Sequence, residues 1–332
     1  MDRRFTRRWQ RYGLLLGVVG VVAYAAHRFR TEPSASDQHE SAGDEQRLIT
    51  ERHGAVFLVG RRIESRRVDA VTERVERTLA GSDPQRLLGL EGASTASLFL
   101  DRSGSDPELL WYVEVPRTIV AKWADPERTV ADAFPIGHDA LAEPSQATDR
   151  SLLVHAANPR RPRRLAADGS NSNEAGTLAV AVDGTVPGVD VDLVRMDLEP
   201  GLPERFADWF AKVSRRVIDG ELDLGRVEAW SGEMLDAERM YTESLLIERG
   251  DDGYAGYLYM EAADMQGVYD AYYDTRNPVA RASEHLLGRL LRNPECVLEY
   301  PLETDAELLA HAVNPDRPRR PEDCPERSYS NN

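Results

Sequence analysis

Apolar and polar residues follow two different periods along this chain, and each period predicts one kind of element. An apolar run at 55–63 predicts a strand, and a stripe of apolar residues at helical spacing predicts a helix directly after it. A second strand and a second helix are predicted in the same order, at 189–198 and 206–217. The two stripes consist of Val68, Val71, Val75 and Leu79 in the first helix, and of Phe206, Trp209, Phe210, Val213 and Val217 in the second.

Each predicted helix is followed by two strands joined by a turn. The runs at 94–102 and 241–249 read as strands, and each is followed by a turn that contains Gly and Asp, and then by another strand. Strand, turn and strand predict a β-hairpin. The two hairpins align so that Glu114 in the first corresponds to Glu261 in the second.

A helical pattern follows each hairpin, at 129–134 and 267–272, and each half then closes with nearly the same phrase. The phrases are "TDRSLLVHAANPRRPRR" from Thr148 and "TDAELLAHAVNPDRPRR" from Thr304, which are identical at 12 of 17 positions. Each half therefore reads β-α-β-β-α before its closing apolar run, which is the order of a ferredoxin-like domain. We expect an α+β fold built from two such domains.

The second half also resembles a known family. The segments "LVRMDLEPGLPERFADWFAKV", "YTESLLIERGDDGYAGYLYMEA" and "YYDTRNPVARASEHLLGRLL" are similar to a family of small, uncharacterised prokaryotic domains of the dimeric α/β-barrel type. The first half matches more weakly, through its hairpin and its closing phrase. Such domains usually bury one apolar sheet face by forming a homodimer. The resemblance therefore implies that this chain carries both partners, as an intramolecular pseudo-dimer closed into one dimeric α/β barrel.

Polar stretches divide the chain into segments. The sequences "TEPSASDQHESAGDEQ" and "LAADGSNSNEAGT" lack any core-forming pattern and are typical of linkers. The expected organisation is an N-terminal membrane anchor or signal at 1–30, a linker at 31–46, a ferredoxin-like domain at 47–164, a linker at 165–188, a second ferredoxin-like domain at 189–320 and a disordered tail at 321–332.

The N-terminus carries an apolar run, Gly13 to Ala26, without any charge. Aromatic residues at its edges and flanking arginines that can snorkel extend it to a plausible transmembrane helix. Five arginines precede the run, so the positive-inside bias predicts a single-pass protein with a cytoplasmic N-terminus and an extracytoplasmic body. The alternative is a signal peptide cleaved after Ala23-Tyr24-Ala25, which would secrete the body.

The charge balance restricts the partners of the body. The net charge is −16, and only Lys122 and Lys212 among 41 basic residues are lysines. This acidic, arginine-rich composition resembles that of proteins from salt-accumulating (haloarchaeal) organisms, and an acidic mesophile is the alternative. So negative a body repels phosphate backbones, and we expect no nucleic-acid partner. Cys296 and Cys324 could pair in an oxidising compartment, or remain free.

Familiar catalytic signatures are missing from the sequence. It contains no G-x-G-x-x-G, P-loop, H-E-x-x-H, G-x-S-x-G or C-x-x-C motif, and it indicates no metal site. Histidines remain as candidate catalytic residues. His155 and His311 lie at equivalent places in the repeated phrase and could be ligands or acid–base groups. Alternatively, each ring bonds a backbone carbonyl and docks its closing segment. His285, on a helix predicted at 279–291, resembles the histidine of a Glu-His pair in the resembled family; alternatively, it is a half-exposed helix histidine.

A candidate ligand site follows from the second hairpin. Tyr257, Tyr259 and Glu261 share one face of their strand by period two. In the barrels that the chain resembles, this face lines a cavity, which implies a small-molecule pocket. Alternatively, the tyrosines are core residues. The pairs Arg163-Arg164 and Arg319-Arg320 could clamp an anion, or are solvated.

The sequence therefore supports a function class and no specific reaction. The leading hypothesis is a membrane-anchored binding or scaffolding module that takes a small-molecule ligand. The alternative is an oxidoreductase-like barrel, similar in fold to cofactor-free monooxygenases or haem-handling proteins, that uses His285 or His311. A purely structural envelope protein is the third hypothesis. The sequence identifies no cofactor.

Overall fold

The computed structural model describes the chain from Leu48 to Cys324, with gaps. The described residues are 48–79, 85–103, 106–137, 149–166, 176–181, 184–199, 212, 215–216, 226–250, 253–275, 287–302 and 304–324. The predicted anchor and the linker that follows it lie outside these residues. Within the described ranges, no helix is both long enough and apolar enough to cross a bilayer.

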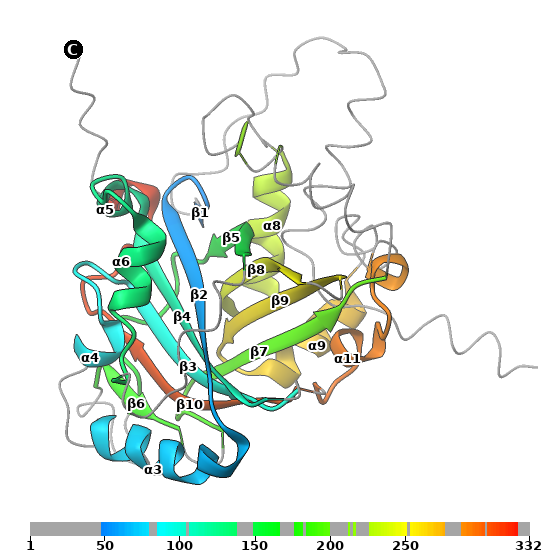
Figure 1. Ribbon diagram of the computed structural model, residues 1–332. Helices are drawn as coiled ribbons and strands as arrows, with labels where there is room; N and C mark the ends of the chain where they lie inside the picture. The colour runs from blue at the N-terminus through cyan, green and yellow to red at the C-terminus, as the bar shows by residue number, and fades with distance from the viewer. Residues whose placement is uncertain are drawn as a thin grey trace, which may run out of the picture.

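The described strands form two antiparallel sheets of five strands each (Figure 1). Sheet I has the order β1 (Ile49–Thr50), β5 (Asp149–Ala157), β8 (Met240–Gly250), β9 (Gly253–Ala262) and β7 (Asp190–Asp197). Sheet II has the order β2 (Gly54–Arg62), β4 (Glu108–Pro116), β3 (Thr95–Asp101), β10 (Ala306–Val313) and β6 (Leu178–Val180). The fold is therefore α+β, as predicted.

The closing strand of each half lies in the sheet of the other half. Strand β5 comes from the first half but runs antiparallel to β8, with His155 opposite Ser244. Strand β10 comes from the second half but runs antiparallel to β3, with His311 opposite Ser97. Both closing strands carry a register shift just before the histidine. The repeated phrase thus occupies equivalent places in the two sheets, with the strands exchanged.

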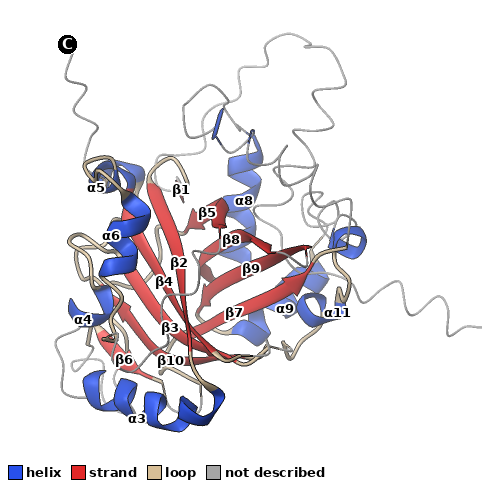
Figure 2. Cartoon of the chain, in the orientation of Figure 1, coloured by secondary structure: helices blue, strands red, loops and turns tan. Residues whose placement is uncertain are grey.

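The two sheets face each other and approach at both margins, where β2 lies beside β5 and β7 lies beside β10. Most strands are therefore buried on both faces. In β4, Trp111 and Val113 point to the helices, whereas Leu110 and Tyr112 point to the opposite sheet. Burial on both faces explains why such strands read as continuous apolar runs in the sequence. Figure 2 shows the strands at the centre with helices on either side.

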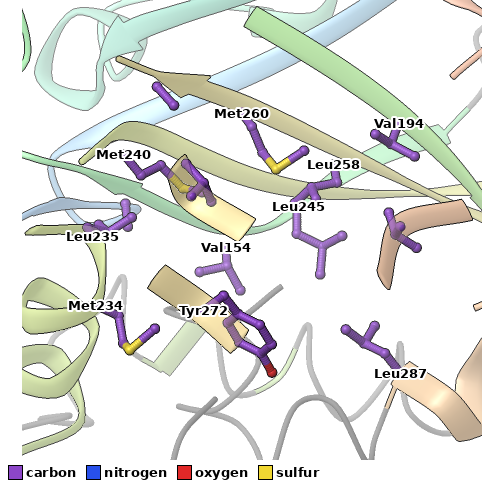
Figure 3. Close-up of a cluster of buried hydrophobic side chains, with 14 of the residues drawn as sticks. Val154, Val194, Met234, Leu235, Met240, Leu245, Leu258, Met260, Tyr272 and Leu287 are labelled. Atoms are coloured by element: carbon purple, nitrogen blue, oxygen red, sulfur yellow. The ribbon is translucent and has the colours of Figure 1, made fainter. Parts of the chain in front are cut away.

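Helices cover the outer face of each sheet. They form two hydrophobic cores in addition to the one between the sheets. Sheet II is covered by α3 (Val68–Leu79), α4 (Gln85–Leu88), α5 (Arg117–Val120) and α6 (Pro126–Asp132), which pack around the first helix-side core. Sheet I is covered by α8 (Arg226–Ala237), α9 (Met265–Asp274) and α11 (Glu295–Leu298), which pack around the second helix-side core, part of which is shown in Figure 3. Single 3-10 turns are formed by η2 (Ser65–Arg67) and η5 (Pro321–Asp323).

Local sequence signals explain how these elements begin. Asp125 caps α6, because its side chain accepts a hydrogen bond from the Arg128 backbone at 3.0 Å and Pro126 occupies the first helical position. The stripe Val71, Val75 and Leu79 is the buried face of α3, as its spacing predicts.

Most predicted elements are confirmed. The four hairpin strands, the opening strands β2 and β7, the helices α3, α6 and α9 and both closing strands lie where the pattern predicts them. The predicted helix at 206–217 lies almost wholly outside the described residues. The helix predicted at 279–291 is described only from Leu287, where residues 287–290 are helical.

Candidate functional site

Two matching polar networks lie between the sheets. In the first network, Ser244 Oγ is 2.9 Å from both Tyr112 OH and His155 Nδ1. On the other side of the ring, His155 Nε2 lies 3.9 Å from Glu114 Oε1. Arg161 completes the network, because its Nη1 and Nη2 donate to the two oxygens of Glu114 at 2.7 and 3.0 Å. All five side chains are buried.

The second network repeats this arrangement with equivalent residues. Ser97 Oγ is 3.1 Å from Tyr259 OH and 2.9 Å from His311 Nδ1. His311 Nε2 lies 3.9 Å from Glu261 Oε1, the same separation as in the first network. Arg317 Nη2 donates to Glu261 Oε1 at 3.1 Å. These five side chains are also buried.

Strand exchange is what assembles each network. Tyr112 and Glu114 come from β4 in sheet II, whereas Ser244 and His155 come from β8 and β5 in sheet I. The two networks meet where Tyr112 stacks on Tyr259, with ring centroids 3.5 Å apart and ring planes within 8°. Each network therefore joins both sheets and both halves of the chain.

The two repeated phrases also contact each other directly. Arg161 donates from Nε and Nη2 to the carbonyl oxygen of Pro318, at 3.1 and 2.5 Å. Arg317 donates in return to the carbonyl oxygen of Pro162 and, at 2.9 Å, to Thr95 Oγ1. Each buried guanidinium thus binds a carboxylate and the backbone of the opposite phrase. Buried charges are tolerated only with such partners.

The electrostatic environment keeps the carboxylates charged and the imidazoles neutral. Burial alone would raise the pKa of Glu114, but the Arg161 guanidinium brings it down to about 2. Arg317 likewise lowers the pKa of Glu261 against the effect of burial. Burial lowers the pKa of His155 to about 4 and that of His311 to about 4, although the neighbouring glutamates partly oppose this shift. At neutral pH, both rings are uncharged.

The sequence of groups Ser, His and Glu resembles the order in acyl-transfer enzymes, but the geometry does not support that chemistry. The Ser244 hydroxyl already has Tyr112 as a second partner, and the Glu114 carboxylate is held by Arg161 rather than by the imidazole. Neither histidine ring has any exposed surface through which a substrate could approach. Among the described residues, no group of three His, Cys, Asp or Glu is placed to hold a metal ion.

A separate ion bridge spans the sheets near the start of β5. Arg150 donates to Glu108 of β4 at 2.9 Å and to Glu248 of β8 at 2.7 Å. Its guanidinium carbon also lies 5.1 Å from the centre of the Tyr257 ring. We call this set of four residues the Arg150 bridge. It has no second copy, because the position equivalent to Glu108 is Ala255.

The predicted site residues have different environments. Tyr259 and Glu261 belong to the second network, and Tyr257 belongs to the Arg150 bridge, so all three face the space between the sheets. Whether they frame a pocket for a small molecule stays a prediction. His155 and His311 bond serine hydroxyls rather than the backbone carbonyls considered above. His285 lies outside the described residues.

The predicted arginine pairs contribute little to this interior. Arg163 and Arg164 are exposed, as is Arg320, while Arg319 Nε donates to the carbonyl oxygen of Pro159 at 2.6 Å. Cys324 is a free thiol in the structure.

Sequence reasoning missed several network residues. Arg161, Arg317, Ser97 and Ser244 were not selected, although each is identical to its counterpart in the other half. Identity between the two copies was therefore a usable signal. The Arg-Pro pair that follows each Asn-Pro is its clearest part.

Comparisons with known proteins add little. No protein-family model matches the chain, and no curated protein matches it. Solved structures show limited similarity. A candidate monooxygenase from Fusobacterium nucleatum has a TM-score of 0.35 at 8% identity, covering 79% of this chain and 92% of that one. A candidate monooxygenase from Lactobacillus acidophilus has a TM-score of 0.34 at 11% identity, covering 79% of this chain and 96% of that one. A candidate chlorite dismutase has a TM-score of 0.28 at 12% identity, covering 80% of this chain and 94% of that one. At such TM-scores, the fold is best described from strand order and register alone.

Proposed function

We propose that this protein is a binding or scaffolding module, built as an intramolecular pseudo-dimer of two ferredoxin-like halves. The exchange of β5 and β10 supports this architecture, because the closing strand of each half lies in the sheet of the other. In this view, the repeated phrase exists twice because each copy fastens one half to its partner. The barrel of the resembled family is thereby closed within a single chain.

One observation carries the choice of a module over an enzyme. The polar groups between the sheets are bonded mainly to one another: the two tyrosines, two serines, two glutamates and two arginines of the networks all have partners within the chain. A catalytic group must be reachable by its substrate, and these groups are buried. Groups that satisfy each other at such depth specify one packing arrangement.

The architecture can be tested by cutting the full-length chain. A protease recognition sequence is inserted between Ser170 and Asn171, in the predicted linker, and the folded protein is cleaved there. Exchanged strands predict that the two fragments stay together in size-exclusion chromatography and separate only in denaturant. Fragments that separate in buffer alone would overturn the pseudo-dimer.

A matched cut provides the control and tests the proposed anchor. The same recognition sequence is inserted between Ser34 and Ala35, so that cleavage removes only the N-terminal segment. If residues 1–30 anchor the protein, this cut releases the body from isolated membranes, whereas the cut at Ser170 leaves both fragments on them. A body that is soluble before cleavage contradicts the anchor.

The oxidoreductase-like alternative predicts a different result. Haem is added to the full-length protein and the absorption spectrum is recorded. A haem-handling barrel predicts a Soret band that shifts in the His311→Ala variant. The proposed module predicts no specific band in either protein.

A further inference from the structure

The stacked tyrosines at the centre of the molecule have an unusual geometry for neutral rings. Tyr112 and Tyr259 lie almost face to face, with centroids 3.5 Å apart and planes within 8°. Neutral aromatic pairs prefer offset or edge-to-face arrangements with centroids about 4.5–7 Å apart, because their faces carry negative charge. The neighbouring pair of Phe99 and Tyr259 follows that preference, at 6.3 Å and 83°. Two rings in face-to-face contact are instead well arranged to share the electron vacancy that is left when one electron is removed.

Each tyrosine hydroxyl also has a built-in route for its proton. Tyr112 OH, Ser244 Oγ and His155 Nδ1 form a chain with two separations of 2.9 Å. The hydroxyl of Tyr259 has the equivalent chain through Ser97 to His311. Both imidazoles are neutral at pH 7, since burial lowers their pKa values. A neutral imidazole whose Nδ1 faces a hydroxyl can accept a proton there.

Burial prevents these phenols from losing their protons by ordinary ionisation. The pKa values of Tyr112 and Tyr259 are raised well above the usual tyrosine value, first because the rings are buried and also because glutamates lie nearby. Removal of one electron changes this situation, since an oxidised phenol is a very strong acid. Its proton then leaves along the chain of hydrogen-bonding groups that reaches the phenol oxygen.

We propose that Tyr112 and Tyr259 form a one-electron redox site that holds a tyrosyl radical between the two sheets. The oxidant is a one-electron acceptor in solution, such as a high-potential metal complex, and it takes up one electron. The O–H bond of one tyrosine breaks, its proton moves to the serine oxygen, and the proton of that serine moves to histidine Nδ1. The return of an electron from a one-electron donor reverses these steps.

The remaining network residues suit this cycle. The imidazolium formed at His155 faces the Glu114 carboxylate across 3.9 Å, so its charge is partly neutralised. Arg161 holds that carboxylate ionised and in place. Neither tyrosine has exposed surface, so the radical cannot couple with a second radical in solution. This inference rests on the tyrosine pair and its proton routes, and it is independent of the scaffolding role.

The test generates a ruthenium(III) polypyridyl complex by a light flash in the presence of the full-length protein. Electron paramagnetic resonance and absorption spectra then follow the organic radical. We expect a long-lived tyrosyl signal in the unaltered protein. In the Tyr112→Phe/Tyr259→Phe variant, its half-life should fall by about tenfold or more. An unchanged half-life in that variant would overturn the proposal.

Matched variants locate the radical and test the proton route. Replacing the exposed tyrosines, as Tyr273→Phe/Tyr300→Phe, should leave the long-lived signal intact, and loss of the signal there would also overturn the proposal. The Ser97→Ala/Ser244→Ala variant keeps both rings but interrupts both proton routes. It should lower the radical yield and abolish the solvent-deuterium effect on radical formation. Single Tyr→Phe variants, which change the core least, should each retain one route and a reduced signal.

Discussion

The two helix-side cores of this molecule are built from different side chains. The second core contains Met196, Met234, Met240, Met260 and Met265, which are all the methionines of the chain except Met1. The first core contains no methionine among the described residues and is filled instead by Val, Leu, Ile, Ala, Phe and Trp111. Both cores nevertheless cover equivalent sheets. In these cores, the right total side-chain volume and hydrophobic pattern are sufficient for packing. Flexible methionines fill the gaps whose shapes differ between the two cores.

The two polar networks between the sheets show the opposite behaviour. Tyrosine, serine, histidine, glutamate and arginine recur at every equivalent position, with similar separations. A buried polar group needs a partner of matching chemistry, so one member cannot change alone. The comparison shows that apolar core residues can differ between the two halves, whereas the buried polar residues of the networks are the same in both.

The largest expected effect of a single substitution comes from breaking one buried ion pair. Glu114→Ala leaves the Arg161 guanidinium buried without its carboxylate, and should lower the free energy of unfolding by about 3–5 kcal/mol. Denaturant unfolding of the full-length protein measures this loss. Glu261→Ala should cost a similar amount, because the second network is equivalent. If Glu114→Leu/Arg161→Met, which removes both charges, is no more stable than Glu114→Ala, this explanation is wrong.

Acid should weaken both networks together. The pKa of each histidine is about 4 in the fold against an ordinary 6.5, so the unfolded chain takes up protons more readily. The stability contribution is complete above pH 6.5 and is lost as the pH falls towards 4. The loss is roughly 3 kcal/mol for each ring, at about 1.4 kcal/mol per pKa unit. Thermal unfolding across this pH range measures it.

The histidines can be separated from other titrating groups. His155→Asn/His311→Asn should flatten the pH dependence between 6.5 and 4. It should leave the further loss of stability below pH 4.5. There the unfolded chain takes up a proton at Glu114, whose ordinary pKa is 4.5, whereas the folded protein does not, because its pKa for this carboxyl group is about 2. Asp192, whose pKa burial raises to about 6, acts in the opposite direction in both proteins. An unchanged slope in the double variant contradicts the assignment to the histidines.

A smaller effect is expected at the Arg150 bridge, which exists in one copy only. A methyl group added in Gly60→Ala would overlap Glu108 Oε1 and Arg150 Nη1, so the bridge must shift. We expect a loss of about 1–3 kcal/mol, as for other overpacked sites. The control is Gly288→Ala, where an added Cβ meets no atom. Equal stability of the two variants would show that the bridge adjusts freely.

The smallest effect should come from replacing one apolar side chain of a helix-side core by another of similar volume. Met260 corresponds to Val113 in the other half, and Met260→Leu should cost less than about 1.5 kcal/mol because the volume is nearly conserved. Calorimetry of this variant beside Glu261→Ala, one position away on the same strand, provides the sharpest form of the comparison. A Met260→Leu loss as large as that of Glu261→Ala would remove the distinction between the two kinds of core.

The strands and most helices could be predicted because the same hydrophobic pattern occurs in both halves of the chain. The hairpins at Thr95–Pro116 and Met240–Ala262 and the helix α3 follow directly from hydrophobic period and turn residues. The exchange of β5 and β10 could not be predicted, for a physical reason. Ser97 and Ser244 offer the same partner to either histidine, so local pairing preferences cannot decide which hairpin each closing strand joins.

The candidate site was predicted in part for a related reason. His155, His311, Tyr259 and Glu261 stand out by repetition and by strand period, and all four belong to the networks. The arginines were harder to choose, because each phrase contains several. Which guanidinium is buried depends on the position of Glu114 across the sheet interface, and sequence spacing alone does not give that position.

The exchanged strands set an order on synthesis of the protein. Sheet II begins with β2 and has its hairpin complete by Pro116, but it receives β10 only after Val313 has been made. Domains usually fold as they leave the ribosome, N-terminal part first. Here the sheet of the half that is made first stays incomplete, with β10 missing and β6 without the strand it pairs with, until a strand near the end of the chain has been made. Completion of the first half and completion of the whole molecule are therefore the same event.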